Sequence, residues 1–289
     1  METTKRYRRV GTPDLPVASY PIRAGNDMHY ISHYHEETEM VMVLSGWETV
    51  QIGSLRSTFT QGDIYTIPAN TVHSRLDFSP DAAIRSVVFS PAAIALSPEH
   101  FFQQEFVTPL QEHRLLLPPV LKPDHPAYHA VSAQIQEIGK HRIYKDGFKL
   151  GRFSAIMNIC MTLMPYCQVV SGEAPVSDPG NEAVKCCMRY IHNRYNKKLT
   201  LETLAEKCHL HPNYLCAVFK AYTGQTVFEY INRYRIEIAA DLLRKEDLPV
   251  SQVAELTGFR SESLFYQKFK EYTGMTPKAY QKQTLTIDN

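Results

Sequence analysis

Two similar stretches near the carboxyl end decide the fold: LAEKCHLHPNYLCAVFKAYTG at residues 204–224 and VAELTGFRSESLFYQKFKEYTG at residues 253–274. Each stretch predicts a short helix, a tight turn and a second helix that ends at Tyr-Thr-Gly, and the second turn is one residue longer. Pro212 suits the first turn of a helix, whereas Gly224 and Gly274 suit the left-handed residue that ends one. The repeat therefore predicts two copies of a helix-turn-helix unit.

Local signals extend this prediction on both sides. Thr200 is suited to cap the helix before the first turn, and Thr226 and Glu229 form a capping box that opens a long connecting helix reaching about Arg244. The apolar face of each second helix is expected to be buried. The expected inward positions are Leu215, Val218, Phe219 and Tyr222 in the first unit and Leu264, Phe265, Phe269 and Tyr272 in the second.

The outward faces of the second helices are typical of DNA recognition. A rigid connecting helix holds two such helices about one DNA turn apart, roughly 34 Å, so that one chain reads two successive major grooves. We expect base contacts, with more sequence discrimination from the second unit, at Asn213, Cys216, Ala217, Ser261, Glu262, Ser263, Tyr266 and Gln267. We expect phosphate contacts at Lys197, Lys198, Lys220, Arg233 and Lys270.

Charge and composition agree with this interpretation. Residues 181–289 carry 16 basic and 12 acidic side chains, whereas residues 1–180 carry 15 and 18. The 289 residues are 44% hydrophobic and 21% charged, which excludes a disordered or collagen-like chain and fits two domains. No apolar run reaches the roughly 20 residues of a membrane span, and no secretory signal is recognisable. We therefore expect a cytoplasmic protein whose six cysteines are reduced thiols.

The first half of the chain has the pattern of a β-structure. Short runs at residues 40–44, 48–52, 57–60, 64–68 and 84–89 are predicted to be strands of a small barrel or jelly-roll. Two helices are expected between about residues 126 and 165. The predicted α+β organisation is an amino-terminal arm at residues 1–20, a β-barrel followed by helices at 21–167, a linker at 168–180, and an all-α double helix-turn-helix domain at 181–289.

Residues 199–282 resemble the DNA-binding domain of AraC/XylS-type transcription regulators over essentially its whole length. The motifs are Leu204-Ala205, Tyr214-Leu215, Phe219-Lys220 and Gly224, the Arg235, Ala239 and Leu242-Leu243 positions of the connecting helix, and Val253-Ala254, Gly258-Phe259, Ser263-Leu264-Phe265, Phe269-Lys270, Gly274, Thr276-Pro277 and Tyr280. The family often has Ser where His211 and Arg260 stand, so the second cap is expected to move to Ser261.

This resemblance implies several partners. They are double-stranded DNA, a small-molecule effector bound in the barrel, a second copy of the chain, and RNA polymerase. The helices between residues 126 and 165 are expected to form the homodimer. Activation is the implied output, and a carbohydrate or related metabolite is the implied effector. The basic arm, with Lys5, Arg6, Arg8 and Arg9, is suited to contact DNA or the DNA-binding domain, or is a frayed terminus.

The barrel region resembles the two cupin motifs. The first runs His33-x-His35-x3-Glu39-x6-Gly46, and the second runs from Gly62 through Pro68 and Asn70 to His73, with Asn70 and Asp27 where the family commonly has glycine. The resemblance places His33, His35, Glu39 and His73 at the metal-binding positions of cupin enzymes. Alternation along a strand would project His33 and His35 from one face, and such a ligand set suits Zn, Fe, Mn or Ni.

Three interpretations of this cluster stay open: a divalent metal site, a polar pocket for an organic effector, or hydrogen-bonded structural residues. Further pocket candidates are Trp47, Tyr65, Arg75 and Ser86. An effector-controlled regulator without enzyme activity is the main hypothesis for the chain. A metal-dependent cupin enzyme fused to a DNA-binding domain, and an effector-independent regulator with a structural barrel, are the alternatives.

Overall fold

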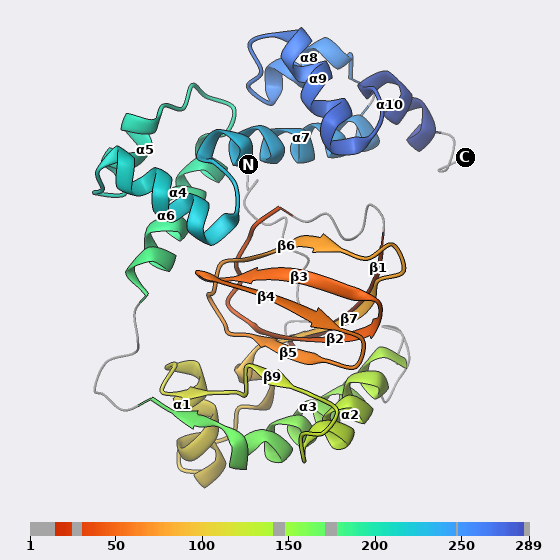
Figure 1. The fold of residues 1–289 in the computed structure, drawn as a ribbon, viewed down its shortest axis with the longest axis vertical. Helices are drawn as coiled ribbons and strands as arrows, with labels where there is room; N and C mark the ends of the chain where they lie inside the picture. The colour runs from red at the N-terminus through yellow and green to blue at the C-terminus, as the bar shows by residue number, and fades with distance from the viewer. Residues whose placement is uncertain (1–14, 25–30, 141–147, 171–177, 247, 286–289) are drawn as a thin grey trace. The chain divides into compact units, whose positions relative to one another are not determined.

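A computed structural model describes residues 15–24, 31–140, 148–170, 178–246 and 248–285. The chain divides into two compact units at the bond between Pro179 and Gly180. The first unit contains the β-sheets and the second is helical, which confirms the predicted α+β class (Figure 1). The arm's Lys5, Arg6, Arg8 and Arg9, as well as Asp27, lie outside the described residues. Within the described ranges, no helix has the length and apolar character needed to cross a membrane.

Two antiparallel sheets face each other in the first unit, as in a jelly-roll. The larger sheet has the order β1-β7-β2-β5-β9, and the smaller has the order β4-β3-β6. Their strands are β1 (Val17–Arg23), β2 (Thr38–Ser45), β3 (Trp47–Ile52), β4 (Leu55–Thr60), β5 (Ile64–Ile67), β6 (His73–Phe78), β7 (Ala83–Phe89) and β9 (Val120–Leu121).

All five predicted strands are present, as β2, β3, β4, β5 and β7. Strands β1 and β6 were not predicted. The predicted arm is wrong at its last residues, because residues 17–20 belong to β1 and pair with β7. In the predicted linker, β10 (Gln168–Val169) pairs with β8 (Leu115–Leu116), and residues 171–177 lie outside the described ranges.

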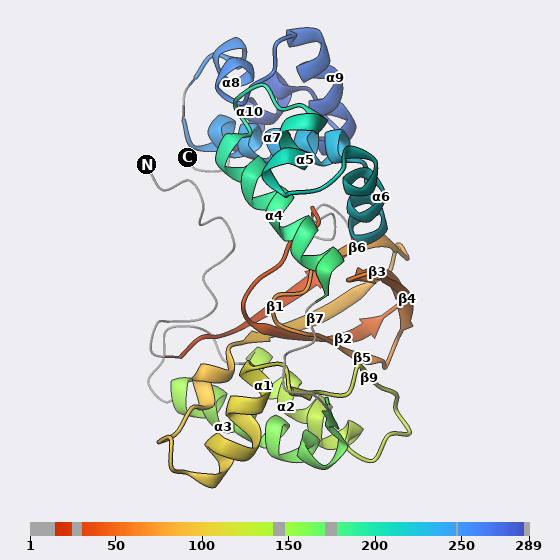
Figure 2. The ribbon, with the colours of Figure 1, turned by 90° about the vertical axis from the view of Figure 1, so that its left-hand side faces the viewer.

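Helices cover one face of the larger sheet. Helices α2 (Tyr128–Lys140) and α3 (Phe148–Leu163) lie together on that side (Figure 2), as the sequence predicted. Met40 and Met42 of β2 pack among their apolar side chains. The alternate residues Val41 and Val43 face the interior between the two sheets. Because both faces of β2 are buried, its sequence is an almost unbroken apolar run. The connecting elements are η2 (Pro91–Ile94), η3 (Gln103–Val107), α1 (Thr108–Gln111) and η4 (Met164–Tyr166).

Seven helices form the described part of the second unit: α4 (Pro179–Arg194), α5 (Leu201–Lys207), α6 (Pro212–Thr223), α7 (Val227–Lys245), α8 (Val250–Leu256), α9 (Glu262–Thr273) and α10 (Pro277–Leu285). Thr200 caps α5, and Thr226 and Glu229 form the predicted capping box at the start of α7. Gly224 and Gly274 end α6 and α9 in left-handed conformations, with φ of 71° and 77°. The repeated helix-turn-helix pattern is therefore present as α5–α6 and α8–α9.

One histidine of α4 lies against the connecting helix. His192 Nε2 shares a hydrogen bond of 2.8 Å with the Tyr230 hydroxyl, and its ring stacks on Tyr234 at a centroid distance of 4.2 Å. Burial lowers the pKa of His192 to about 4. The imidazole is therefore neutral in the folded unit at neutral pH.

This pKa predicts a pH-dependent loss of stability. As the pH falls from about 6.5 to about 4, the unfolded chain takes up a proton that folded His192 rejects, so the free energy of unfolding decreases by about 3 kcal/mol. Denaturant unfolding curves between pH 7 and pH 4 measure this effect. The His192→Gln variant should lose that part of the pH dependence, whereas variant His209→Gln, at an exposed histidine of the same unit, should retain it. Equal pH dependence in all three proteins would contradict the assignment.

Candidate nucleic-acid interface and buried polar cluster

Helices α6 and α9 present matching exposed faces. On α6, Asn213, Cys216, Ala217 and Lys220 are exposed, opposite the buried Leu215, Val218, Phe219 and Tyr222. Fifty residues further on, Ser263, Gln267 and Lys270 of α9 are exposed at equivalent positions, as are Ser261 and Glu262 at its start. Tyr266 is half-buried and packs against the core of the second helix-turn-helix. The structure thus brings most of the predicted readers onto two equivalent helix faces.

The two recognition helices begin at different caps. His211 Nδ1 accepts a hydrogen bond of 3.3 Å from the backbone N–H of Asn213, and Ser261 Oγ accepts one of 3.3 Å from Leu264. The expected shift of the second cap to Ser261 is confirmed. Arg260 is left exposed just before this cap. The sequence interpretation treated Arg260 only as a poor cap and missed it as a basic side chain beside a recognition helix.

The prediction that Leu264 faces inward is wrong. Its side chain is 41% exposed, because the rings of Phe265 and Phe269 fill the core beneath α9. Tyr214, at the equivalent place on α6, is 50% exposed. Tyr214 directly follows Asn213, and Leu264 directly follows Ser263, both of which are predicted base contacts. This position next to a predicted base contact was the sequence signal for exposure that the interpretation overlooked.

The predicted phosphate contacts differ in accessibility. Lys197, Lys198, Lys220 and Lys270 are exposed. Arg233 of α7 is half-buried, and its guanidinium carbon lies 5.9 Å from the centre of the Tyr272 ring. That contact holds Arg233 against α9. The four lysines are therefore the more accessible cations of this set.

Helix α7 carries both recognition helices. It has 19 residues, which corresponds to a length of roughly 28 Å. Tyr230 packs on Phe219 of the first helix-turn-helix with ring centroids 5.3 Å apart, and Ile236, Ala239 and Leu243 belong to the core of the second helix-turn-helix. A helix of this length is comparable to one turn of B-DNA.

Three histidines converge in the first unit. One ring nitrogen from each of His33, His35 and His73 lies within 4.8 Å of the others. The backbones of His33 and His73 form a β-bridge with N–H to O distances of 3.0 and 2.8 Å. The expectation that His33 and His35 lie on one regular strand is wrong, since His35 belongs to no strand. A backbone hydrogen bond of 2.7 Å from Asn70 N–H to the His35 carbonyl holds this segment instead.

Each imidazole is oriented by a backbone carbonyl. The Nδ1–H groups of His33, His35 and His73 donate to the carbonyls of Ile31, Glu37 and Thr71 at 3.0, 2.9 and 2.8 Å. In a neutral imidazole of this tautomer, Nε2 carries the lone pair that a metal ion would use. His73 Nε2 is buried without a hydrogen-bond partner. Metal-binding histidines are typically oriented in this way, so the three side chains fit a divalent transition metal.

Two buried carboxylates complete the cluster. Glu39 accepts a hydrogen bond of 2.6 Å from Ser86, and its Oε2 lies 3.3 and 3.5 Å from the Nε2 atoms of His35 and His73. Glu48 accepts hydrogen bonds of 2.9 Å from the Tyr65 hydroxyl and from Arg75 Nε. A second Arg75 nitrogen lies 3.9 Å from Glu39. Arg75 therefore bridges the two carboxylates.

The pKa shifts of the cluster follow from burial and neighbouring charges. Burial lowers the pKa of His33 and that of His73. Burial also opposes the charge on His35 and on Glu39, but their mutual hydrogen bond outweighs it, raising the pKa of His35 and lowering that of Glu39. Burial raises the pKa of Glu48, which its contacts with Arg75 and Tyr65 oppose. When both carboxylates are ionised and the imidazoles are neutral, the cluster has a net charge of minus one. That excess favours a proton on His35 or a metal cation.

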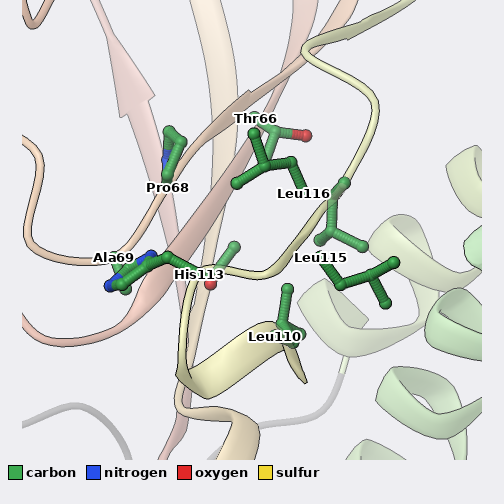
Figure 3. A pocket seen from close by; sticks show the side chains of 9 residues that line it. Thr66, Pro68, Ala69, Leu110, His113, Leu115 and Leu116 are labelled. Carbon is green, nitrogen blue, oxygen red and sulfur yellow. The ribbon is translucent and has the colours of Figure 1, made fainter. Parts of the chain in front are cut away.

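Trp47 does not join this cluster. It starts β3 and is 36% exposed, whereas the next residue, Glu48, is fully buried in the interior. A separate pocket on the outer side of the larger sheet contains none of the predicted site residues (Figure 3). It is lined by Thr38, Thr66, Pro68, Ala69, Leu110, His113, Leu115, Leu116 and Leu117. Because Thr38 and Glu39 are adjacent on a strand, this pocket and the histidine cluster lie on opposite faces of the sheet.

Comparisons with known proteins match both units. A helix-turn-helix domain model matches residues 204–283, and a cupin domain model matches residues 24–75. The probable transcriptional regulator LumQ of Photobacterium leiognathi is 26% identical over 250 residues, covering 86% of this chain and 91% of that protein. The uncharacterised helix-turn-helix transcriptional regulator YdeC of Bacillus subtilis is 27% identical over 278 residues, covering 94% and 93%.

A third relative is similar over a shorter region. The melibiose operon regulatory protein of Escherichia coli is 36% identical over 93 residues, which cover 32% of this chain and 31% of that protein. Together with the duplicated helix-turn-helix on α7 and the cupin-type unit, these similarities show a transcriptional regulator with an AraC-type helix-turn-helix domain and a cupin domain.

Proposed function

We propose that this chain is a sequence-specific DNA-binding regulator whose α6 and α9 enter two successive major grooves. The observation that carries the proposal is the equivalence of the exposed faces at Asn213 to Lys220 and at Ser263 to Lys270. Both faces belong to helices that pack on α7, so their spacing is fixed before DNA binds. Preorganised spacing reduces the conformational entropy lost on binding.

The two faces have different chemistry. On α9, Gln267 and Glu262 can form hydrogen bonds with base edges, whereas Cys216 and Ala217 of α6 offer apolar contact to thymine methyl groups. We therefore infer that α9 supplies more of the sequence discrimination. Exposed Tyr214 and Leu264 extend the apolar contact area at the start of both helices.

The polar cluster in the first unit is the proposed effector site. Its carboxylates, imidazoles and guanidinium can all form hydrogen bonds with hydroxyl groups, which favours a carbohydrate or a related metabolite as the effector. The similarity to the melibiose operon regulatory protein supports a sugar. An effector that binds one conformational state more tightly shifts the population towards that state and so controls DNA binding.

A divalent metal is the second ligand proposed for this cluster. His33, His35, His73 and Glu39 would hold it, because their lone pairs converge and the cluster has a net negative charge. Zn, Fe, Mn and Ni suit this ligand set. A bound metal would supply a Lewis-acid centre for an oxygen atom of the effector. Arg75 and Ser86 would keep Glu39 in place.

A homodimer through α3 fits the surface of the first unit. Leu150 is 73% exposed and Met161 is 59% exposed, and their spacing of eleven residues places both on one side of the helix with half-buried Met157. A second copy of the chain that covers this stripe would let the dimer occupy two operator half-sites. Contact of the bound dimer with RNA polymerase would make the regulator an activator.

Substitutions on α9 test the DNA-binding proposal. In duplexes selected by the full-length protein from random DNA, Gln267→Ala should lose about 1–3 kcal/mol of binding free energy and relax the preference at one base pair. Lys270→Ala should weaken all duplexes similarly and reduce the salt dependence. The matched control is Lys268→Ala, since Lys268 pairs with Glu271 on the same helix. Unaltered binding by Gln267→Ala would contradict the proposed orientation of α9.

Ligand binding to the cluster is tested by thermal unfolding of the full chain after chelation. Zn, Ni, Mn or Fe ions at 100 times their dissociation constant should stabilise the folded state by about 2.7 kcal/mol, and an effector sugar should do the same. The double variant His33→Ala with His73→Ala should lose the metal effect, whereas His113→Ala in the outer pocket should keep it. Metal binding that survives the double variant would place the ion elsewhere.

Dimerisation is tested by light scattering. Leu150→Glu combined with Met161→Glu should convert a dimer into a monomer, because two charges would be buried in the interface. Leu55→Glu is the matched control, since Leu55 is also 73% exposed but lies on β4. A dimer that withstands the α3 double variant, or a monomeric wild-type protein, would exclude this interface.

A further inference from the structure

The outer pocket lies between two segments of the first unit. Thr38 of β2 and Thr66 of β5 line it from the larger sheet. Four leucines line it from the end of α1 and from the segment that continues towards β9 (Figure 3), namely Leu110, Leu115, Leu116 and Leu117. Its empty volume is about 360 Å³, which includes space open to solvent. A partly open cavity of this size suits a small ligand.

Backbone hydrogen bonds hold both ends of the leucine segment. At the end near β9, the Thr66 N–H donates to the Pro119 carbonyl at 3.0 Å. At the end near α1, the Arg114 N–H donates to the Pro109 carbonyl at 2.8 Å. The pocket is therefore a fixed part of the fold before any ligand binds.

The pocket wall contains a buried hydroxyl group that lacks a partner. Thr66 is 6% exposed, and its Oγ1 forms no hydrogen bond with any residue that the structure describes. A buried hydroxyl without a partner costs free energy, so most such groups in proteins meet another protein atom, a water molecule or a ligand. A ligand oxygen in the pocket would give Thr66 Oγ1 the hydrogen bond it lacks.

Uncharged side chains dominate the wall of the pocket. Among the nine described residues that line it, none is Asp, Glu, Lys or Arg, and His113 is the one titratable side chain. The four leucines, Pro68 and Ala69 make most of the wall apolar. An ion would leave water here without an opposite charge to pair with, which is costly. The wall therefore favours an uncharged ligand that has an alkyl part and a hydroxyl group.

We propose that the outer pocket binds a small neutral aliphatic alcohol. Its hydroxyl group hydrogen-bonds with Thr66 Oγ1, and its alkyl group packs against Leu110, Leu115 and Leu117. This site is separate from the histidine cluster, because Thr38 and its neighbour Glu39 lie on opposite faces of β2. The first unit thus offers two binding sites of different chemistry, and the outer one does not depend on the function proposed for the cluster.

The pocket also adjoins the strand that leads out of the first unit. Strand β8, which contains Leu115 and Leu116, pairs with β10. Next to this pair, the Val170 N–H donates to the Arg114 carbonyl at 2.9 Å. From Val170 the chain continues to α4. An alcohol that packs against Leu115 and Leu116 therefore stabilises the β8–β10 pair, and this coupling does not depend on the proposed DNA-binding function.

Nuclear magnetic resonance titration of the full-length protein with isobutanol tests the site. Isotope-labelled methyl groups of Leu110, Leu115 and Leu117 should shift on binding. The isosteric Thr66→Val variant loses no hydrogen bond in the unliganded protein, so it should fold normally and bind isobutanol roughly threefold to tenfold more weakly. Thr58→Val, at an exposed threonine of β4, is the matched control and should bind like the wild type. Unshifted leucine methyl groups, or equal binding by Thr66→Val, would overturn the proposal.

Ligands with the same alkyl group test the chemical class. Isobutyrate and isobutylammonium should bind roughly tenfold more weakly than isobutanol or worse, since neither charge has a partner in the pocket. Ala69→Leu should fill the pocket and abolish isobutanol binding, whereas Ala92→Leu, at an exposed alanine of η2, should keep it. Isobutyrate that binds as tightly as isobutanol would overturn the assignment of a neutral ligand. Isobutanol binding that survives Ala69→Leu would place the alcohol elsewhere.

Amide hydrogen exchange tests the coupling to β10. With isobutanol at ten times its dissociation constant, exchange of the Val170 amide should slow by up to about tenfold, because the ligand must leave before β8 and β10 separate. The amide of Ala82, which bonds to the Ser79 carbonyl at 3.0 Å, is the control and should exchange at its original rate. An unchanged rate at Val170 in the saturated protein would overturn the coupling, whereas the methyl shifts decide ligand binding separately.

Discussion

The burial of α7 along both of its ends is the constraint on which the DNA-binding unit depends. At one end, Tyr230 fits against Phe219, and at the other, Ala239 and Leu243 fill the core under α9. Burial of an apolar side chain stabilises the fold by roughly 1.5–3 kcal/mol. Separating either helix-turn-helix from α7 would therefore cost several such contributions. A single continuous helix therefore joins two helix-turn-helix motifs, each too small to hold a large core alone, and fixes the spacing between α6 and α9.

Close contacts between the residues after α4 and both α7 and the second helix-turn-helix reinforce this arrangement. Arg235 of α7 donates hydrogen bonds of 2.8 and 3.0 Å to the carbonyls of Tyr195 and Lys197 after α4. Gly258, at the second turn, has φ of 85°, and a Cβ there would lie 2.8 Å from the Cα of Asn196. The second turn thus needs glycine for both its conformation and its neighbour. Helix α4 and the residues that follow it therefore contact both helix-turn-helix motifs.

The first unit follows a different physical rule. Its interior contains two carboxylates, one guanidinium and three imidazoles, all of them buried or half-buried. Buried charges are costly unless each is paired, and here Arg75 and the hydroxyl groups of Ser86 and Tyr65 provide the pairing. The histidines are instead oriented by backbone carbonyls, which leaves a set of directed lone pairs. Such preorganisation is what a ligand-binding site needs and a purely structural core does not.

Much of this protein was determined by local sequence alone. Caps at Thr200 and Ser261, left-handed glycines at 224 and 274, and helical periodicity specify the repeated units, because each signal acts through neighbouring residues. The motif spacing likewise identified His33, His35, Glu39 and His73 as one group. Tertiary structure alone decided that Leu264 is exposed and that Trp47 faces away from Glu48. These outcomes depend on which competing side chain fills a shared core and on which distant segments pack together, and periodicity within one segment carries no information about either.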